Sequence, residues 1–486
     1  MNKFDIHFRL ISKEMGFILG LEALLMFLSA LVSAYYQEPI IKYIWISGGI
    51  TFATGLLLSW YGHGTTVKNI AKKDSILTVT LSWVLFSIFG MLPYYLSGAI
   101  PSITDAFFET MSGLTTTGSS ILTDVEAMPK GLLFWRSLTQ WIGGLGMIVF
   151  VLAFMPLIAG GGSSYLYEDE APGIVKDKFR PRVGQISKRL WLIYLTFTVV
   201  LAVLLRLGPM NTFDACCHAF TTMSTGGFST KNISIAYWNS AYVEYVIAIF
   251  SLIGAINFTL WYFFFKRNYK RLFKDEELRW FLGIIIVATL IVTCCLLYNK
   301  EYDNFSDSFR TSFFHVTTLF NFSTTDFTQW GPFFLFVISF LILIGGSGGS
   351  TSGGLKVIRF VILCKNTMNE FSRQIHPRAI IPVRINQNAV SHRIVQRVLA
   401  FAFLYMSTVL ISVGVFTATG IRLEDAWGIS LSGIGNVGPG FGAFGPSGNF
   451  SIMTDFAKWY YSLLMIVGRL ELFTVLILFT PGFWKK

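Results

Sequence analysis

Charged residues are scarce in this chain. Only 13% of its 486 residues are Asp, Glu, Lys or Arg, whereas soluble domains carry about 25%. Hydrophobic residues make up 53% of the chain, and several apolar runs approach the roughly 20 residues that a helix needs to cross a bilayer. This composition excludes an ordinary soluble domain and predicts an integral membrane protein.

Cysteine and histidine are also few. The five cysteines form two adjacent pairs and a lone Cys364, a pattern that fits neither a disulfide framework nor a metal site. The histidines are scattered and form no cluster at acid–base spacing; they are His7, His63, His218, His315, His376 and His392. We therefore expect no enzyme activity, no cofactor in this chain and no metal other than a transported ion.

The net charge of +11 comes from short basic connections between apolar segments. A nucleic-acid partner would need a basic soluble face instead, so we expect none. The positive-inside rule places these connections in the cytoplasm, which predicts an even number of spans and two cytoplasmic termini. The connections are Lys3 to Lys13, Lys68 to Lys73, Lys176 to Arg189, Lys266 to Arg279, Arg373 to Arg397 and Lys485 to Lys486.

The first apolar stretch is too long for the core of a signal peptide and lacks a convincing cleavage site, so it is interpreted as the first transmembrane helix. Ten spans are predicted, at 16–36, 42–62, 76–98, 132–158, 190–207, 240–265, 280–298, 331–363, 396–419 and 457–482. After the first two, the other eight form four pairs. Each pair is joined on the outer side by a connection that is too apolar for a solvated loop.

Three of these four connections share an internal pattern. Asp105, Asp214 and Asp425 each open an apolar segment of about ten residues, and a glycine follows thirteen positions after each. Aspartate is a good helix N-cap, and a helix this short cannot span a bilayer. We predict that each segment enters halfway as a helix capped by its aspartate, and returns as extended Gly/Thr-rich backbone. The aspartates would also attract cations at the outer mouth.

Irregular backbone at membrane depth is tolerated only where protein buries it or where it lines a watery cavity. Four such connections therefore indicate one shared pore. The predicted fold is an all-α polytopic membrane protein with four pseudo-symmetric repeats of helix, re-entrant pore helix with its loop, and helix, plus two extra N-terminal transmembrane helices. The expected boundaries are 1–70 for the two extra helices and 71–160, 186–270, 276–365 and 390–486 for the repeats.

Potassium gives up its water only where oxygens replace the hydration shell, as rings of backbone carbonyls do in selectivity filters. Glycine allows positive φ and close approach, Thr and Ser add hydroxyl oxygens, and the C-terminal end of a short helix favours cations. The candidate filter residues are Thr115, Thr116, Thr117 and Gly118; Ser224, Thr225, Gly226 and Gly227; Asn321, Ser323 and Thr324; and Asn436, Val437 and Gly438.

The third connection departs from the pattern, because residues 317–327 contain no glycine. A gapless alignment puts Thr324 at the glycine position, whereas a short deletion puts Asn321 there; both remain open. Asn tolerates left-handed backbone better than most residues, and Asn321 would then reproduce the turn. This irregular quarter keeps a sodium-permeable or non-selective cation transporter as an alternative. An ion-coupled secondary transporter of a small solute would also use broken helices, but it would carry its polar groups on helices.

Several motifs together resemble the Trk/Ktr/HKT superfamily of potassium transporters over almost the whole chain, and the two extra N-terminal helices are similar to its TrkH branch. The motifs are residues 115–118, 135–146, 224–230, 345–359, 436–440 and 468–471. The resemblance implies potassium uptake at the cytoplasmic membrane of a bacterium. It also implies a homodimer with one pore per subunit and a cytoplasmic TrkA-type regulatory ring that binds NAD or ATP.

The resemblance further implies an intramembrane gate beneath the filter, where a Gly-rich segment breaks the long eighth helix. Its candidate residues are Gly345, Gly346, Gly348, Gly349, Gly353 and Gly354. So many glycines unwind a helix readily, although close helix packing is an alternative role. Arg469 is a costly cation within the last apolar span. The resemblance implies that it limits flow, and the alternative is an ion pair with Glu471 or with an acidic residue on another helix.

Overall fold

The computed structural model describes residues 6–65, 72–153 and 179–485. The described chain is almost entirely helical, and its only strands are the two-residue pair β1 (Arg384–Ile385) and β2 (Asn388–Ala389). The predicted all-α fold class is therefore confirmed. The predicted boundary at residue 70, the end of the fourth span (154–158) and most of the basic connection that follows lie outside the described residues.

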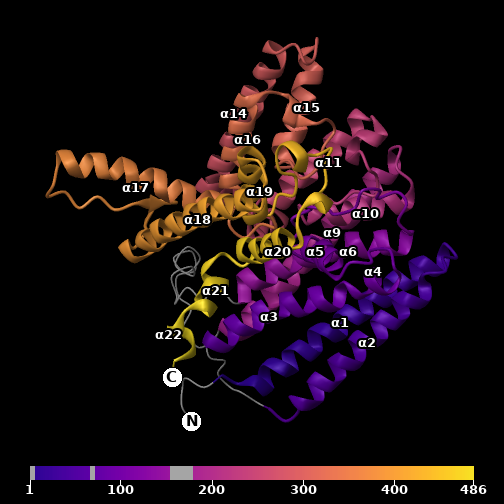
Figure 1. Cartoon of the computed structure of the whole chain (residues 1–486). Helices are drawn as coiled ribbons and strands as arrows, with labels where there is room; N and C mark the ends of the chain where they lie inside the picture. The colour runs from indigo at the N-terminus through magenta and orange to yellow at the C-terminus, as the bar shows by residue number, and fades with distance from the viewer. Residues whose placement is uncertain (1–5, 66–71, 154–178, 486) are drawn as a thin grey trace.

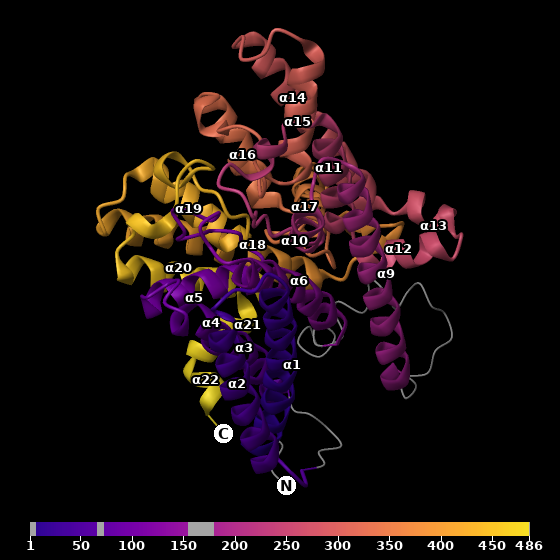
Figure 2. The ribbon, with the colours of Figure 1, turned by 90° about the vertical axis from the view of Figure 1, so that its right-hand side faces the viewer.

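The two N-terminal helices, α1 (Phe8–Tyr35) and α2 (Ile41–Tyr61), form a tightly packed hairpin. A Cβ atom at Gly16 would lie only 2.5 Å from the carbonyl oxygen of Gly55, so small residues allow the two backbones to approach closely. The hairpin lies on one side of the molecule beside α3 (Lys72–Gly90) in both views (Figures 1 and 2).

After this hairpin the chain forms four units, each with a short helix of 12 or 13 residues that comes after a longer first helix. Unit 1 has α3, α4 (Leu92–Leu96), α5 (Ile103–Leu114) and α6 (Lys130–Ala153). Unit 2 has α9 (Phe179–Leu207), α10 (Thr212–Met223), α11 (Ala241–Ala255) and α12 (Phe258–Phe265). Unit 3 has α14 (Glu276–Tyr298), α15 (Phe305–Thr317), α16 (Pro332–Ile344) and α17 (Val357–Ile375). Unit 4 has α18 (His392–Ala418), α19 (Leu423–Gly435), α20 (Asp455–Arg469) and α21 (Phe473–Leu476).

Short elements complete the described chain. They are the α-helices α13 (Tyr269–Lys274) and α22 (Pro481–Trp484) and the 3₁₀ turns η2 (Ser234–Trp238), η3 (Phe327–Gln329), η4 (Gly442–Phe444), η5 (Phe450–Ile452) and η6 (Ile477–Phe479). Most of the 3₁₀ turns follow the short helix of a unit and lead the chain back to the next long helix.

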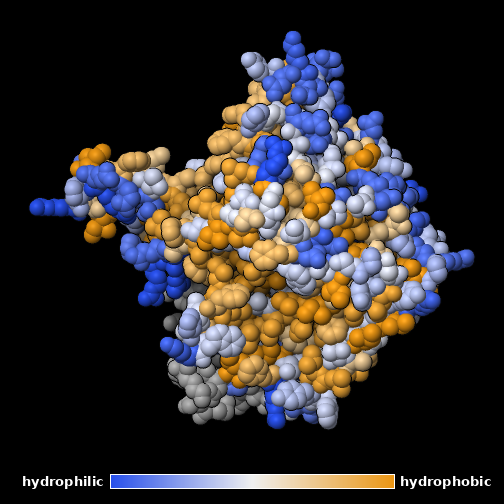
Figure 3. All heavy atoms as spheres, viewed as in Figure 1, coloured by the Kyte–Doolittle hydropathy of each residue, from blue (hydrophilic) through white to orange (hydrophobic). Residues whose placement is uncertain are grey.

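The long helices expose apolar side chains, whereas the short helices are buried. Leu24 and Leu31 on α1, Leu57 on α2 and Leu192 on α9 are all largely exposed, while residues 106–114 of α5 are buried without interruption. A wide hydrophobic surface covers the side formed by α1 to α3 (Figure 3). An exposed apolar patch of this extent marks a lipid-facing surface, so the chain is an integral membrane protein.

Among the described residues, six helices are long and apolar enough to cross a membrane, and two bent pairs would raise the number to eight if each pair is one span. The predicted count of ten therefore stays a prediction. Two predicted spans are wrong as continuous helices: the span 240–265 bends by 101° after α11, and the span 457–482 bends by 113° after α20. The predicted break of the eighth span, 331–363, is confirmed, because helix is interrupted between Ile344 and Val357.

The expected capping role of the aspartates is also corrected. Ser102 caps α5 by accepting the amide of Asp105 (3.3 Å), and Asn211 caps α10 by accepting the amide of Asp214 (2.8 Å). Asp425 follows Leu423, the first residue of α19, whose N-cap position holds Arg422 without a side-chain cap. Each aspartate therefore lies within the first turn, where a carboxylate still interacts favourably with the helix dipole.

Candidate functional site

Each of the four short helices ends in the same backbone arrangement. The amides of Thr117, Gly226, Phe320 and Val437 each donate to the carbonyl five residues earlier, at distances of 2.8 to 3.1 Å. The segments around these residues are named loop 1 (115–119), loop 2 (224–228), loop 3 (318–322) and loop 4 (436–440). Because the hydrogen bonds match, the residues that follow these amides, Gly118, Gly227, Asn321 and Gly438, occupy equivalent positions.

This equivalence selects one of the two alignments of the third loop, with Asn321 rather than Thr324 at the glycine position. The expectation that Asn321 supplies the left-handed turn is wrong, however, because the left-handed residue falls one position earlier, on Phe320 (64°). Leu319 (51°) is left-handed like the corresponding residue of the other three loops. In the other loops the glycine itself is left-handed, with φ between 83° and 108°. Without a glycine, the third loop therefore turns one residue earlier.

The glycine positions lie where consecutive loops touch. A Cβ atom at Gly118 would collide with the carbonyl oxygen of Gly226, and one at Gly227 would collide with that of Asn321. A Cβ at Gly438 would lie 2.6 Å from the carbonyl oxygen of Thr117. Loops 4, 1, 2 and 3 thus follow one another with their backbones in close contact, and any side chain larger than hydrogen at these glycines would separate them.

Side chains join loop 1 to loop 4. The hydroxyl of Ser119 donates to the carbonyl of Gly438 (2.9 Å), and the side-chain amide of Asn436 donates to the hydroxyl of Thr117 (3.0 Å). The hydroxyls of Thr115 and Thr117 share a further hydrogen bond of 2.7 Å. These bonds fix residues from opposite ends of the sequence in one buried polar cluster.

Helix α6 supports loop 2 through two residues that the sequence reasoning did not assign to the site. Gln140 donates from Nε2 to the carbonyl of Gly226 (2.9 Å) and accepts the amide of Phe228 at Oε1 (3.1 Å). Arg136 donates to the carbonyl of Ser229 (2.9 Å) and to Glu109 (2.7 Å). The signal was present, since charged and amide side chains within an apolar helix indicate a functional or paired position.

Not all candidates in the third loop join this cluster. Asn321 does, because its side-chain amide donates to the carbonyl of Thr225 in loop 2. The carbonyl of Ser323 instead accepts the amide of Ile235 (3.2 Å), outside the four loops. Thr324 follows Ser323, and its hydroxyl is buried without a partner among the described residues.

The Gly-rich segment lies next to loop 2 and against the break between α11 and α12. The amides of Ser347 and Thr351 donate to the carbonyls of Ala255 (3.0 Å) and Gly254 (3.3 Å), respectively. The hydroxyl of Thr225 donates to that of Thr351 (3.2 Å). The segment from 345 to 356 therefore contacts the candidate filter directly, as an intramembrane loop rather than a continuous helix.

One charged side chain holds this segment from outside, and another stabilises it from within. Glu277 of α14 accepts the amide of Gly348 (2.6 Å), and Lys356, only 3% exposed, donates to the carbonyl of Ser352. The first residues of α17 are tied to the end of unit 4, because Arg359 forms an ion pair with Glu471. The segment is thus fixed at its start, its middle and its end by separate polar contacts.

Arg469 is 1% exposed and bridges the segment to unit 1. It donates to the carbonyl of Thr351 (2.5 Å) and to that of Gly143 on α6 (3.0 Å). The alternative pairing with Glu471 is not formed, since Glu471 pairs with Arg359. Arg469 forms no ion pair with a described carboxylate, so its positive charge remains within the buried region around the loops.

At the candidate outer mouth, one of the aspartates is neutralised by an ion pair. Asp105 pairs with Lys458 (2.6 Å), and Asp214 accepts the hydroxyl of Thr230 (2.6 Å). In the connection between α5 and α6, hydrogen bonds from Asn232 and from the backbone amide of Ala127 lower the pKa of the Asp124 carboxyl. Asp105 therefore holds a lysine rather than an open anionic site, while Asp124 keeps a negative charge on the connecting loop.

The arrangement suits coordination of a dehydrated cation. Backbone carbonyls and hydroxyls cluster at the C-terminal ends of the four short helices, and these ends carry partial negative charge. Among the described residues, no group of three or more His, Cys, Asp and Glu side chains could hold a metal ion. The oxygen donors are therefore neutral, as is typical of sites for monovalent cations.

Comparison with known proteins gives consistent matches. The TrkH family model, described as a cation transport protein, matches residues 41–486. The chain is 37% identical to the Trk system potassium uptake protein TrkH of Halomonas elongata, covering 98% of this chain and 99% of that one. It is 36% identical to the protein of the same name from Salmonella typhimurium, covering 99% and 100%. The crystal structure of the potassium transporter TrkH from Vibrio parahaemolyticus matches with a TM-score of 0.89 at 32% identity, covering 99% of this chain and 100% of that one.

Proposed function

This chain belongs to the TrkH family of cation transport proteins, and on that premise we propose that it takes up potassium through a filter formed by its four loops. The observation that carries the proposal is the contact between loops at Gly118, Gly227 and Gly438, where three glycines remote in sequence each face the carbonyl of the next loop. Neutral oxygens in such a ring replace the water around potassium.

The filter oxygens come from the residues that follow each short helix. In loops 1, 2 and 4 these are residues 115–118, 224–227 and 436–438, and in loop 3 Asn321 takes the corresponding place. Because α5, α10, α15 and α19 all end at these loops, their C-terminal partial charges stabilise a cation there. Gln140 holds loop 2 through the Gly226 carbonyl. Glu109, which pairs with Arg136, accepts the hydroxyl of Ser120 and the amide of Ile121 just after loop 1.

The Gly-rich segment acts as the gate of this pathway. It lies beside loop 2, and its glycines, among them Gly345, Gly349 and Gly354 with positive φ, let it adopt other backbone conformations at low cost. Arg469 keeps it closed through its bond to the Thr351 carbonyl and adds a positive charge that opposes cation flow. Opening requires Arg469 to release Thr351.

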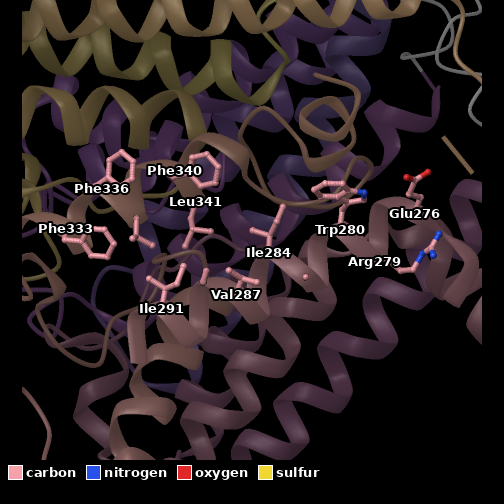
Figure 4. A pocket seen from close by; sticks show the side chains of 13 residues that line it. Glu276, Arg279, Trp280, Ile284, Val287, Ile291, Phe333, Phe336, Phe340 and Leu341 are labelled. Carbon is pink, nitrogen blue, oxygen red and sulfur yellow. The ribbon is translucent and has the colours of Figure 1, made fainter. Parts of the chain in front are cut away.

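We further propose a homodimer in which a second copy covers α14, α16 and α17. A groove of about 640 Å³ lies between α14 and α16 and is lined mainly by apolar side chains such as Phe333, Phe336 and Ile284 (Figure 4). Next to it, α17 projects away from the body (Figure 1) and exposes Met368 and Phe371. A cytoplasmic TrkA-type ring that binds NAD or ATP would act on this same projecting helix to regulate the gate.

The proposed placement is the cytoplasmic membrane of a bacterium with both termini in the cytoplasm. In this proposal the two N-terminal helices lie within residues 1–70, and the pore repeats are 71–160, 186–270, 276–365 and 390–486. The membrane potential then favours potassium entry, by about 2.3 kcal/mol per charge for each 100 mV.

The test is ion flux into proteoliposomes that contain the purified chain, with potassium and sodium compared in parallel. Gly118→Ser is the informative variant, and Gly414→Ser is its matched control, because a Cβ at Gly414 meets nothing within 4 Å. We expect potassium flux above sodium flux in the native protein and in Gly414→Ser, with the difference lost in Gly118→Ser.

A sodium-permeable cation transporter is the second candidate, and the observation that favours it is the missing glycine in loop 3. Equal potassium and sodium fluxes in the native protein would establish this second candidate and reject the first. Absence of any cation flux, with the partner ring added, would reject both.

A further inference from the structure

Asn321 differs from its counterparts in the other three loops because it has a polar side chain where they have none. The hydrogen-bonding pattern places it level with Gly118, Gly227 and Gly438. It is only 9% exposed, so the side chain is enclosed among the loops. A side chain can be accommodated here because loop 3 takes this left-handed turn one residue earlier, at Phe320.

The two ends of the Asn321 amide have different surroundings. Its nitrogen donates to the carbonyl of Thr225 in loop 2, which is one of the candidate filter oxygens. Its oxygen is buried and has no hydrogen-bond partner among the described residues. Since both atoms belong to one planar amide, the free oxygen lies close to the Thr225 carbonyl, at the level of the filter.

Both observations concern the electrostatic potential that an ion meets beside loop 3. A hydrogen bond to the Thr225 carbonyl occupies one of its lone pairs and reduces the negative potential that it presents to a cation. A buried amide oxygen without a partner is unfavourable, whereas a dehydrated cation requires oxygen ligands. A cation at this level therefore gives the Asn321 side-chain oxygen a partner. That oxygen in turn compensates for the negative potential that the Thr225 carbonyl loses to its hydrogen bond.

We propose that the side-chain oxygen Oδ1 of Asn321 is a direct ligand of the transported cation, while its amide nitrogen holds the Thr225 carbonyl. The proposal rests on the proposed function, and it makes the filter a mixed one with three backbone quarters and one side-chain quarter. A side-chain ligand turns about its χ angles more easily than a backbone carbonyl, so it follows ions of different radius. Asn321 is then the residue that sets how strictly potassium is distinguished from sodium.

The test compares three substitutions in the full-length chain reconstituted in proteoliposomes. Asn321→Leu removes both polar atoms at similar volume, Asn321→Gly removes the side chain, and Asn321→Asp keeps the oxygen but loses the donor and adds a negative charge. Thr325→Val is the matched control, because it removes another buried, unpartnered polar atom, a hydroxyl, from the same connection. The readouts are KM and maximal rate for potassium, inhibition by sodium, and the potassium-dependent rise in Tm of the purified protein.

We expect Asn321→Leu and Asn321→Gly to raise KM for potassium about tenfold, which corresponds to about 1.4 kcal/mol, and to reduce the potassium-dependent rise in Tm. Asn321→Asp should lower KM and lower the maximal rate, because a charged ligand binds the ion more tightly and releases it more slowly. Thr325→Val should leave KM unchanged.

If Asn321 only joins loops 2 and 3, Asn321→Asp and Asn321→Leu will change KM in the same direction, and that result overturns the ligand role. An unchanged KM together with an unchanged rise in Tm in Asn321→Gly overturns it as well. If the native protein shows neither potassium flux nor a potassium-dependent rise in Tm, the proposed function itself fails, and the ligand role fails with it.

Discussion

Removal of Arg469 tests the gate most directly. Its guanidinium group donates to the carbonyls of Thr351 and Gly143, but only the first of these belongs to the Gly-rich segment. A hydrogen bond to a charged group contributes about 1.5–3 kcal/mol, and each 1.4 kcal/mol corresponds to a factor of ten in an equilibrium constant. Loss of this bond should therefore raise the population of the open segment about 10- to 150-fold.

Rubidium or potassium flux into proteoliposomes without the regulatory ring measures this change. Arg469→Ala should increase the flux, both by releasing Thr351 and by removing a positive charge from the pathway. Arg469→Lys keeps the charge but cannot make both bonds with the same geometry, so it should give a smaller increase. Arg206→Ala, an exposed arginine at the end of α9, serves as the control and should leave the flux at its native value.

Arg469 does not hold the gate closed if Arg469→Ala leaves the flux unchanged or lowers it while the protein keeps its native Tm. A fall in both flux and Tm would also contradict this gating role, because Arg469 would then support the structure of the closed and open states alike. An equal increase in Arg469→Lys and Arg469→Ala would show that the bond to Thr351, and not the charge, limits flow.

Other predictions concern packing and buried charge. Gly227→Ala should abolish potassium selectivity, since its Cβ collides with Asn321 and a left-handed alanine costs about 1–2 kcal/mol, whereas Gly49→Ala, with open space around it, should leave flux and Tm unchanged. Glu22 of α1 is fully buried, and neither carboxyl oxygen has a partner among the described residues. Glu22→Gln should therefore raise or preserve the Tm, and a large drop would reveal a partner. Glu109→Gln should destabilise the protein by about 3–5 kcal/mol, because it leaves the Arg136 charge buried and unpaired; an additional Arg136→Met should recover much of this loss in thermal unfolding, and failure to do so would assign the loss to loop 1 instead.

The repeated short helices could be predicted because they are written as a local pattern. An aspartate followed thirteen residues later by a glycine marks the first turn of the helix and the left-handed residue after it. Both features depend only on residues that are close in sequence. The pattern misplaced the cap, since Ser102 and Asn211 stand three residues earlier. A cap depends on one side-chain oxygen reaching one amide, and Ser, Asn and Asp are equally suited to it.

The bends after α11 and α20 and the third loop could not be predicted in the same way. Ile256 and Leu470 are ordinary apolar residues, and the bends beside them depend on partners from other units, such as the Gly-rich segment bound to Gly254 and Ala255. The choice between Asn321 and Thr324 likewise required the hydrogen bonds of all four loops. Residue spacing along the chain predicts local structure, whereas these features arise from contacts between units that are far apart in the sequence.

The break between α16 and α17 makes α17 a lever. With 19 residues at about 1.5 Å each, it is about 28 Å long, and it is joined to α16 only through the Gly-rich segment. Its contacts near the pivot, Lys365 with Glu276 and Arg359 with Glu471, lie within the first three turns. In the proposed gate, a force applied at the far end of α17 would therefore be multiplied at the pivot, and a large swing there would become a small, strong displacement of the Gly-rich segment beside loop 2.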